Sequence, residues 1–138
     1  MSGFLRWMDD RFPFTKVWKE HVAEYYTPKN FNFFYYFGAI LTVMLVIQFV
    51  TGIILTMHYK PDVASAFASI EYIMRDVPAG WFVRYLHSVG ASMIFIALYI
   101  HMFRGLMYGS HRSPRELIWL LGMLLYVAMM AEAFFGYL

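Results

Sequence analysis

The sequence predicts an all-α membrane protein, with three transmembrane helices and an N-terminal amphipathic helix on the membrane surface. Of its 138 residues, 61% are hydrophobic and only 14% are charged, and the mean hydropathy of +0.53 lies above the range of soluble domains. Three apolar stretches are each long enough to cross the hydrocarbon core of a bilayer. The net charge of +2 is too small and too scattered to indicate nucleic-acid binding, and lipid is the expected surrounding.

Residues 1–30 are predicted to be an amphipathic segment lying on the membrane. Between Pro13 and Tyr26, apolar side chains recur at helical spacing, and lysine and glutamate side chains lie opposite them. Pro28 is expected to end this helix, because the residue before a proline disfavours helical geometry. The segment has no compact apolar run, so we expect no cleavable signal peptide.

Residues 31–138 are predicted to form a partial transmembrane bundle. No Asp, Glu, Lys or Arg occurs from Asn30 to Tyr59 or from Tyr85 to Phe103, and Glu132 is the single charged residue from Leu117 to the end. Such stretches are typical of membrane spans. We expect the three helices at about 31–58, 80–108 and 114–138.

The connections between the spans carry helix signals of their own. Apolar residues at helical spacing between Pro61 and Met74 predict a short second surface helix. In the other connection, Ser113 is the expected N-cap of the third span, with Pro114 in its first turn and Glu116 completing a capping box.

The distribution of Lys and Arg predicts the orientation. Eight lie in the N-terminal segment and the 104–115 connection, and the other three are Lys60, Arg75 and Arg84. Because positive charge is retained inside, the N-terminus is expected to be cytoplasmic.

His87 and His101 lie fourteen residues apart in the second span. In a helix this spacing leaves the two rings about 40° apart and about 21 Å apart along the axis, so both face one seam, with His87 near the outer surface. A histidine inside a membrane is a functional candidate, and neutral imidazole is a common ligand of haem iron. A hydrogen bond between helices is the alternative for either one alone. The chain has no cysteine, so any haem must be bound non-covalently.

Arginines and glycines accompany the two histidines. Arg84 lies one turn outward of His87, and Arg104 lies one turn beyond His101 on the opposite side. At these positions each arginine could bind haem propionates, and the hydroxyl of Ser110 could do the same. The alternative is that these arginines extend to the membrane surface as ordinary helix-end residues. Glycines repeat the fourteen-residue interval on the flanking spans and would leave room for a flat macrocycle, although close helix packing is the alternative. These glycines are Gly38 and Gly52 in the first span and Gly122 and Gly136 in the third.

Several runs of the chain closely resemble one family. The runs are RYLHSVGAS at 84–92, HMFRGLMYGS at 101–110, QFVTG at 48–52 with MHY at 57–59, and AFFGYL at 133–138. They resemble cytochrome b of the quinol:cytochrome c oxidoreductase, the cytochrome bc complex, in its proteobacterial form. The resemblance implies the N-terminal part of a haem-binding transmembrane four-helix bundle.

The resemblance also implies roles for individual residues. His87 would ligate the low-potential haem near the outer face, and His101 the high-potential haem near the inner face. Arg84 and Arg104 would hold the propionates of the outer and inner haem respectively, and three further sets would line the sites. These sets are Gly52, Gly136 and Gln48 at the outer haem, Gly38 and Gly122 at the inner haem, and Met130, Phe134 and Tyr137 at the outer quinol-oxidation pocket.

In that family, quinol gives one electron to a Rieske iron–sulfur protein, and the other crosses the membrane through the two haems to a quinone at the inner face. Protons are released outside and taken up inside. The implied partners are the Rieske protein, a membrane-anchored c-type cytochrome and a second copy in a homodimeric complex. The implied location is the bacterial inner membrane.

The chain departs from the family at its end. It stops at Gly136-Tyr137-Leu138, where the family continues into a fourth helix that carries a second pair of histidines. These residues alone would therefore offer one axial ligand per haem, and we expect the remaining cytochrome b helices to complete each site. Two other classes stay open: a dihaem membrane anchor of a quinone-linked dehydrogenase, and a haem-free membrane scaffold or channel subunit.

Overall fold

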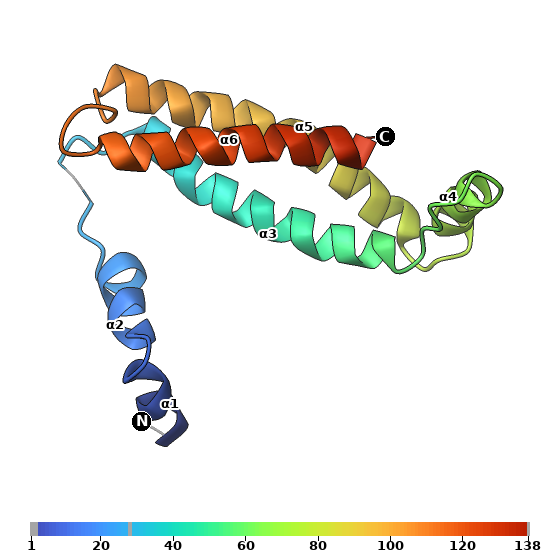
Figure 1. Cartoon of the computed structure of the whole chain (residues 1–138), viewed down its shortest axis with the longest axis horizontal. Helices are drawn as coiled ribbons and strands as arrows, with labels where there is room; N and C mark the ends of the chain where they lie inside the picture. The colour runs from blue at the N-terminus through green and yellow to red at the C-terminus, as the bar shows by residue number, and fades with distance from the viewer. Residues whose placement is uncertain (1–2, 28, 138) are drawn as a thin grey trace. The chain divides into compact units, whose positions relative to one another are not determined.

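A computed structural model describes residues 3–27 and 29–137, without the side chains of Phe4, Leu5 and His21. The expected helix end at Pro28 and the last residue, Leu138, lie outside this part. The described residues are helical with no strand, which confirms the predicted fold class. The chain divides into two units, Met1–Phe31 and Asn32–Leu138. The helices are α1 (Gly3–Asp9), α2 (Phe14–Trp18), α3 (Tyr36–Thr56), α4 (Ala66–Arg75), α5 (Gly80–Met107) and α6 (Glu116–Tyr137) (Figure 1).

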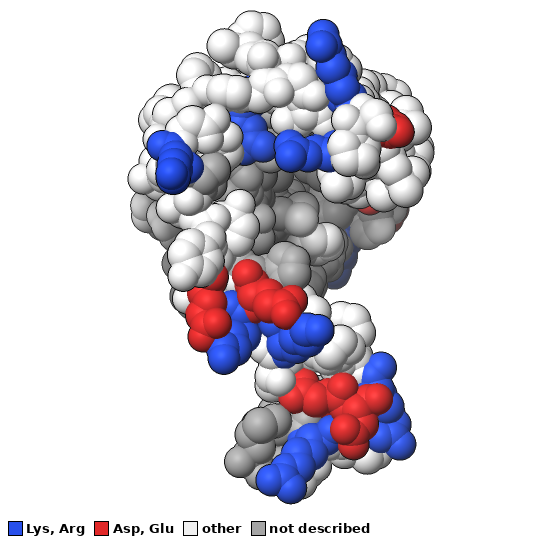
Figure 2. Space-filling model, turned by 90° about the vertical axis from the view of Figure 1, so that its left-hand side faces the viewer, with Lys and Arg blue, Asp and Glu red and all other residues white. Residues whose placement is uncertain are grey.

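The N-terminal unit contains two short helices where the sequence predicts one. Helix α2 continues into a π-helical turn, Lys19–Ala23, so the helical segment ends three residues before Tyr26. The preceding α1 was not expected, because seven residues are too few for a clear apolar period. The carboxylate of Asp9 accepts hydrogen bonds from the backbone N–H (2.9 Å) and the hydroxyl of Thr15, which joins α1 to α2. Side chains of both charge signs lie over this unit (Figure 2).

The second unit is built from three helices that are long and apolar enough to cross a membrane, α3 with the turn before it (Phe33–Thr56), α5 and α6. Within the unit, α3 and α5 pack along each other, and α6 lies beside them (Figure 1). Few of their residues are buried, and none of the described residues of α6 is. Their large apolar side chains point mostly outward, as expected for helices surrounded by lipid or by other apolar helices.

Helix α4 packs against the start of α5, in the connection where the sequence predicts a surface helix. Ile73 is 4% exposed, while Phe67, an expected member of the same apolar face, is 76% exposed. A Cβ at Gly80 would lie 2.0 Å from the carbonyl oxygen of Ile73. Glycine is therefore needed at this position for α4 and α5 to approach.

Helix α6 begins at Glu116, two residues later than expected. The predicted capping box is wrong, because two consecutive turns precede α6, and Ser113 and Pro114 are the central residues of the second one. In these turns the Arg112 N–H donates to the Gly109 carbonyl, and the Arg115 N–H donates to the Arg112 carbonyl. The first helical bond then runs from Trp119 N–H to the carbonyl of Arg115.

Candidate cofactor sites

Each histidine of α5 lies against one glycine of α3. A Cβ at Gly52 would lie 3.2 Å from Cε1 of His87, and a Cβ at Gly38 would lie 3.4 Å from Cε1 of His101. Because a glycine has no side chain, each ring can lie directly against the backbone of the neighbouring helix. The fourteen-residue interval of α5 is thus matched, contact by contact, by the fourteen-residue interval of α3.

His87, which the sequence predicts to lie near the outer face and which is called the outer histidine for that reason, is tied to α3 by two hydrogen bonds. Nδ1 of His87 lies 2.8 Å from the hydroxyl of Thr51, a residue that is only 5% exposed. The amide nitrogen of Gln48 donates to the carbonyl of His87 at 3.0 Å. A Cβ at Gly90 would lie 2.5 Å from that nitrogen, so Gly90 makes room for Gln48 to cross between the helices.

The other residues predicted for the outer side are not gathered around His87. A guanidinium nitrogen of Arg84 lies 3.6 Å from the sulfur of Met74 in α4. Nothing lies within 4 Å of a Cβ at Gly136. Three residues predicted to border the quinol pocket are exposed on α6: Met130 at 43%, Phe134 at 60% and Tyr137 at 93%.

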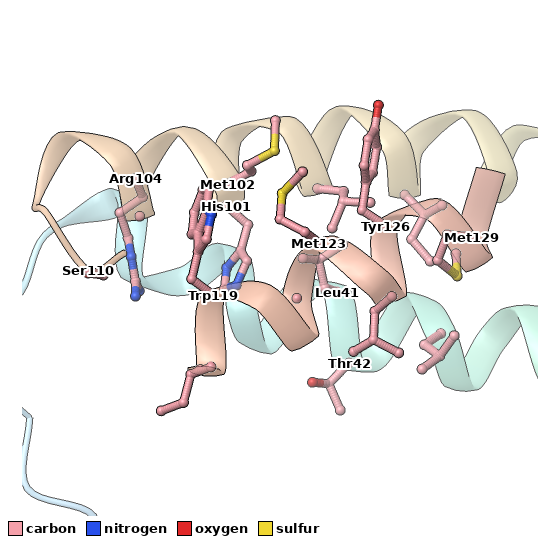
Figure 3. Close-up of a pocket in the computed structure, with 17 residues that line it drawn as sticks. Leu41, Thr42, His101, Met102, Arg104, Ser110, Trp119, Met123, Tyr126 and Met129 are labelled. Atoms are coloured by element: carbon pink, nitrogen blue, oxygen red, sulfur yellow. The ribbon is translucent and has the colours of Figure 1, made fainter. Parts of the chain in front are cut away.

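At the His101 end, predicted to be the inner one and called the inner end for that reason, α3, α5 and α6 enclose a cavity of about 390 Å³. Its lining includes four predicted residues, His101, Arg104, Ser110 and Gly122. Figure 3 shows Arg104 and Ser110 together at one end of the cavity and Tyr126 and Met129 at the other. Nothing lies within 4 Å of a Cβ at Gly122. The cavity therefore combines a histidine, an open wall and a polar end.

Arg104 is positioned by aromatic side chains. Its guanidinium carbon lies 4.6 Å from the centre of the Tyr35 ring, a cation–π distance, and Tyr35 in turn lies 6.0 Å from Tyr108. The phenol oxygen of Tyr108 accepts a hydrogen bond from the side-chain amide of Asn32. Figure 2 shows several separate Lys and Arg side chains on the face that it presents.

Two further histidines, His58 and His111, are half-buried. Nδ1 of His58 lies 2.9 Å from the carbonyl of Ile54. The ring of His111 lies 5.8 Å from that of Trp119, and its Nδ1 is buried without a hydrogen-bond partner.

Sequence reasoning missed Thr51 and Trp119. Thr51 directly precedes Gly52, as Phe37 directly precedes Gly38, so aligning the two halves of α3 would have drawn attention to it. A Cβ at Gly105 would lie 2.9 Å from the Trp119 ring, which shows how closely α6 approaches α5 at the inner end.

The residues fit a haem better than a bare metal ion. Across the part of the chain that the structure describes, no group of three His, Asp or Glu side chains could hold a metal. A single histidine beside an open space suits a macrocycle that would itself supply most of the ligands of its iron and need only one or two from the protein. The guanidinium and hydroxyl at the polar end of the inner cavity suit an anionic edge of such a group.

These observations together define an α-helical membrane protein in which one helix presents two histidines, each against a glycine of the neighbouring helix. The family model for cytochrome b/b6/petB matches residues 22–138, and the chain belongs to this family.

Individual relatives agree with this assignment. Cytochrome b of Allochromatium vinosum is 60% identical over 134 residues, which are 97% of this chain and 32% of that protein. Cytochrome b of Rhodobacter capsulatus is 50% identical over 136 residues, which are 99% of this chain and 31% of that protein. A solved structure described as hyperthermophilic respiratory Complex III is 37% identical, with a TM-score of 0.82, and the match covers 96% of this chain and 34% of that one. The chain thus spans about a third of the length of the curated relatives it matches.

Proposed function

We propose that these residues form the N-terminal part of the cytochrome b subunit of a quinol:cytochrome c oxidoreductase. His87 would ligate the iron of an outer, low-potential b haem, and His101 that of an inner, high-potential b haem. Each haem, when bound, supplies one-electron redox chemistry between the two faces of the membrane. The remaining helices of cytochrome b would supply the second axial ligands.

The observation that carries this proposal is the matched pair of histidine–glycine contacts. Gly52 lies against His87 and Gly38 lies against His101, each at a Cβ-to-ring distance below 3.5 Å. Ordinary helix packing does not require a glycine opposite both histidines at one shared interval. Two cofactor sites along one seam would account for it, because each ligating ring must be held in place and a glycine lets it lie directly against the backbone of α3.

At the inner site, the residues of this chain would divide the binding work. Arg104, held by Tyr35, would form charge-assisted hydrogen bonds with the propionates, and Ser110 would add a hydroxyl donor. Gly122 would leave space on the α6 side of the cavity. Arg84, Gly136 and Gln48 would serve the outer site in the corresponding way.

At the outer face, Met130, Phe134 and Tyr137 would form one wall of the quinol-oxidation pocket. Their exposed side chains on α6 present an apolar surface with one phenol, which suits an apolar ring carrying hydroxyl groups. Quinol bound there would give one electron to a Rieske iron–sulfur protein and the other to the b haems, and quinone at the inner face would accept the latter. Protons would be released outside and taken up inside.

The partners we propose are a Rieske iron–sulfur protein, a membrane-anchored c-type cytochrome and a second copy of the subunit. The solved relative is a respiratory Complex III, which supports a multi-subunit assembly. The bacterial relatives and the excess of Lys and Arg at one end support a bacterial inner membrane with the N-terminus in the cytoplasm.

A reduced-minus-oxidised visible spectrum with a pyridine haemochrome assay, on the full-length membrane-bound protein, tests the proposal. Two b-type haems per cytochrome b are expected, with split low-spin bands. His58→Leu is the matched control for substitution of the two ligating histidines. His58 is half-buried, but its ring lies against the carbonyl of Ile54 and outside both sites, so this variant should keep both haems. A protein without haem would overturn the proposal in favour of a membrane scaffold.

A further inference from the structure

The Thr51 hydroxyl is in contact with the outer histidine while being almost fully enclosed. The residue is 5% exposed, and its oxygen lies 2.8 Å from Nδ1 of His87. Gly52, the next residue, allows the His87 ring to lie against α3. The histidine ring is therefore fixed by a polar contact and a steric contact from two successive residues of one helix.

The direction of the hydrogen bond follows from the other contacts of the hydroxyl. The oxygen of Thr51 lies 2.6 Å from the carbonyl oxygen of Ile47 and 3.3 Å from that of Gln48. A carbonyl oxygen can only accept, so the single hydroxyl hydrogen is directed to Ile47. The hydroxyl must then accept from His87, whose Nδ1 carries the hydrogen. In this neutral tautomer the lone pair is on Nε2, the nitrogen that is left to bind a metal.

The inner histidine has no such contact. Its ring has the same relation to α3, with Cε1 at 3.4 Å and Nδ1 at 3.7 Å from a Cβ at Gly38. However, Nδ1 of His101 is buried without a hydrogen-bond partner. The residue that corresponds to Thr51 is Phe37, which is buried and has no polar group. The position before the glycine thus offers a hydroxyl at one site and no polar group at the other.

We propose that Thr51 is a positioning residue that holds His87 with Nε2 presented to iron and lowers the midpoint potential of the outer haem. The inference rests on the proposed function. An imidazole that donates from its second nitrogen becomes a stronger electron donor to the metal, and a stronger donor favours the ferric form. Because Phe37 offers no acceptor, His101 lacks this effect, and the two sites differ in the direction that the proposed low and high potentials require.

The test compares Thr51→Val with Thr51→Ser in the full-length membrane-bound protein, by redox titration of both b haems. Valine keeps the size of the side chain and removes the acceptor, so the outer midpoint potential should rise while the inner one stays unchanged. Serine keeps the hydroxyl and should restore the original value. We expect a several-fold change in the relative stability of the ferric and ferrous forms, where tenfold corresponds to about 59 mV for one electron. Thr56→Val is the control, since the exposed hydroxyl of Thr56 donates to Ile53.

Each outcome decides between the alternatives. Unchanged potentials in Thr51→Val, with both haems present, would overturn the role of Thr51 and leave the two-haem proposal standing. A wild-type protein without haem would instead overturn the proposed function itself. If Thr51→Val loses the outer haem, the haem content of Thr51→Ser decides. An outer haem retained in Thr51→Ser supports the role of the hydroxyl. An outer haem lost in Thr51→Ser shows that packing alone matters and overturns the inference.

Discussion

The inner and outer halves of the second unit differ, although the same sequence interval specifies both. At the inner half, Trp119 of α6 lies against Gly105 of α5, and a cavity of about 390 Å³ forms around His101. At the outer half, the last residues of α6 are exposed, and His87 is held from α3 by Thr51. The inner histidine thus has a formed cavity and no polar partner, whereas the outer histidine has a polar partner and an open flank.

This difference separates two tasks that a cofactor site must perform. Enclosure decides whether a group is retained, and it depends here on the approach of α6. Orientation of the ligand decides how the bound metal behaves, and it depends on one residue beside each glycine of α3, Thr51 or Phe37. The variants below are designed to change one half of the unit without the other.

Removing the ligand should have the largest effect. His87→Leu and His101→Leu each delete the ligating nitrogen and keep an apolar side chain that a membrane helix tolerates. We expect each variant to lose about half of the total haem, with His87→Leu losing the low-potential component and His101→Leu the high-potential one. Haemochrome quantification with redox titration measures both. Loss of the same component in both variants would show that the two sites are not independent.

Filling the open space beside the glycines of α6 should have the next largest effect. Leucine at Gly122 would enter the inner cavity, and leucine at Gly136 would enter the space proposed for the outer haem. Overpacking typically costs about 1–3 kcal/mol, which corresponds to about 5- to 150-fold weaker retention. Gly122→Leu should therefore reduce the inner haem and Gly136→Leu the outer one, as measured by the haem content that survives purification. Equal losses of both haems from either variant would contradict the assignment of the glycines to different depths.

Alanine at the glycines of α3 makes a finer comparison. At Gly38 the new Cβ would lie 3.4 Å from the His101 ring, an ordinary contact, whereas at Gly52 it would lie 3.2 Å from the His87 ring, which must give way. Alanine favours a helix over glycine by about 0.5–1 kcal/mol, so Gly38→Ala should leave the protein equally or more stable.

In Gly52→Ala that gain is offset, because the ring that moves is the one bonded to Thr51. We expect a raised outer-haem potential in Gly52→Ala and no change at the inner haem in Gly38→Ala. Thermal melting and redox titration measure the two effects separately. A larger disturbance in Gly38→Ala would reverse the comparison and show that the contact distance does not control the ring.

The sequence is a good guide to the spans and a poorer one to their ends. Lipid tolerates only helices with fully satisfied backbones, so long uncharged stretches identify α3, α5 and α6 directly. The start of α6 was missed because Ser113, Pro114 and Glu116 satisfy a local capping pattern, while Ser113 and Pro114 form a turn and the helix begins only at Glu116.

For the sites, the repeated interval identifies which glycines and histidines belong together. It does not give the register of α3 against α5, and this register is what brings Thr51 rather than another hydroxyl to His87. Likewise, the sequence does not show that α6 covers His101 and leaves His87 uncovered. That closure depends on the fit of Trp119 against Gly105, which is a matter of packing between distant segments.

The smallest expected effect concerns the connections at the two ends of the unit. In the outer connection, the carboxylate of Asp62 accepts hydrogen bonds from the Ser65 hydroxyl and the Ala64 N–H. These hydrogen bonds hold the pKa of Asp62 below its ordinary value of 3.8, and the bond from the Ser65 hydroxyl has the largest effect. Because the folded-state pKa is depressed, the stabilisation is present above about pH 3.8 and is lost as the pH falls through the lower folded value.

Hydrogen exchange at the Ala64 and Ala66 amides, corrected for intrinsic rates, should therefore show lower protection as the pH falls below 3.8, and Asp62→Asn should remove this dependence. In the inner connection, the Arg112 and Arg115 amides donate to backbone carbonyls and should show no such step, which makes them the internal control. A step of equal size at both ends would mean that acid loosens the whole unit rather than the Asp62 turn. A step confined to the outer end would show that the two connections, like the two histidines, are held by different means: a titratable side chain outside and backbone turns inside.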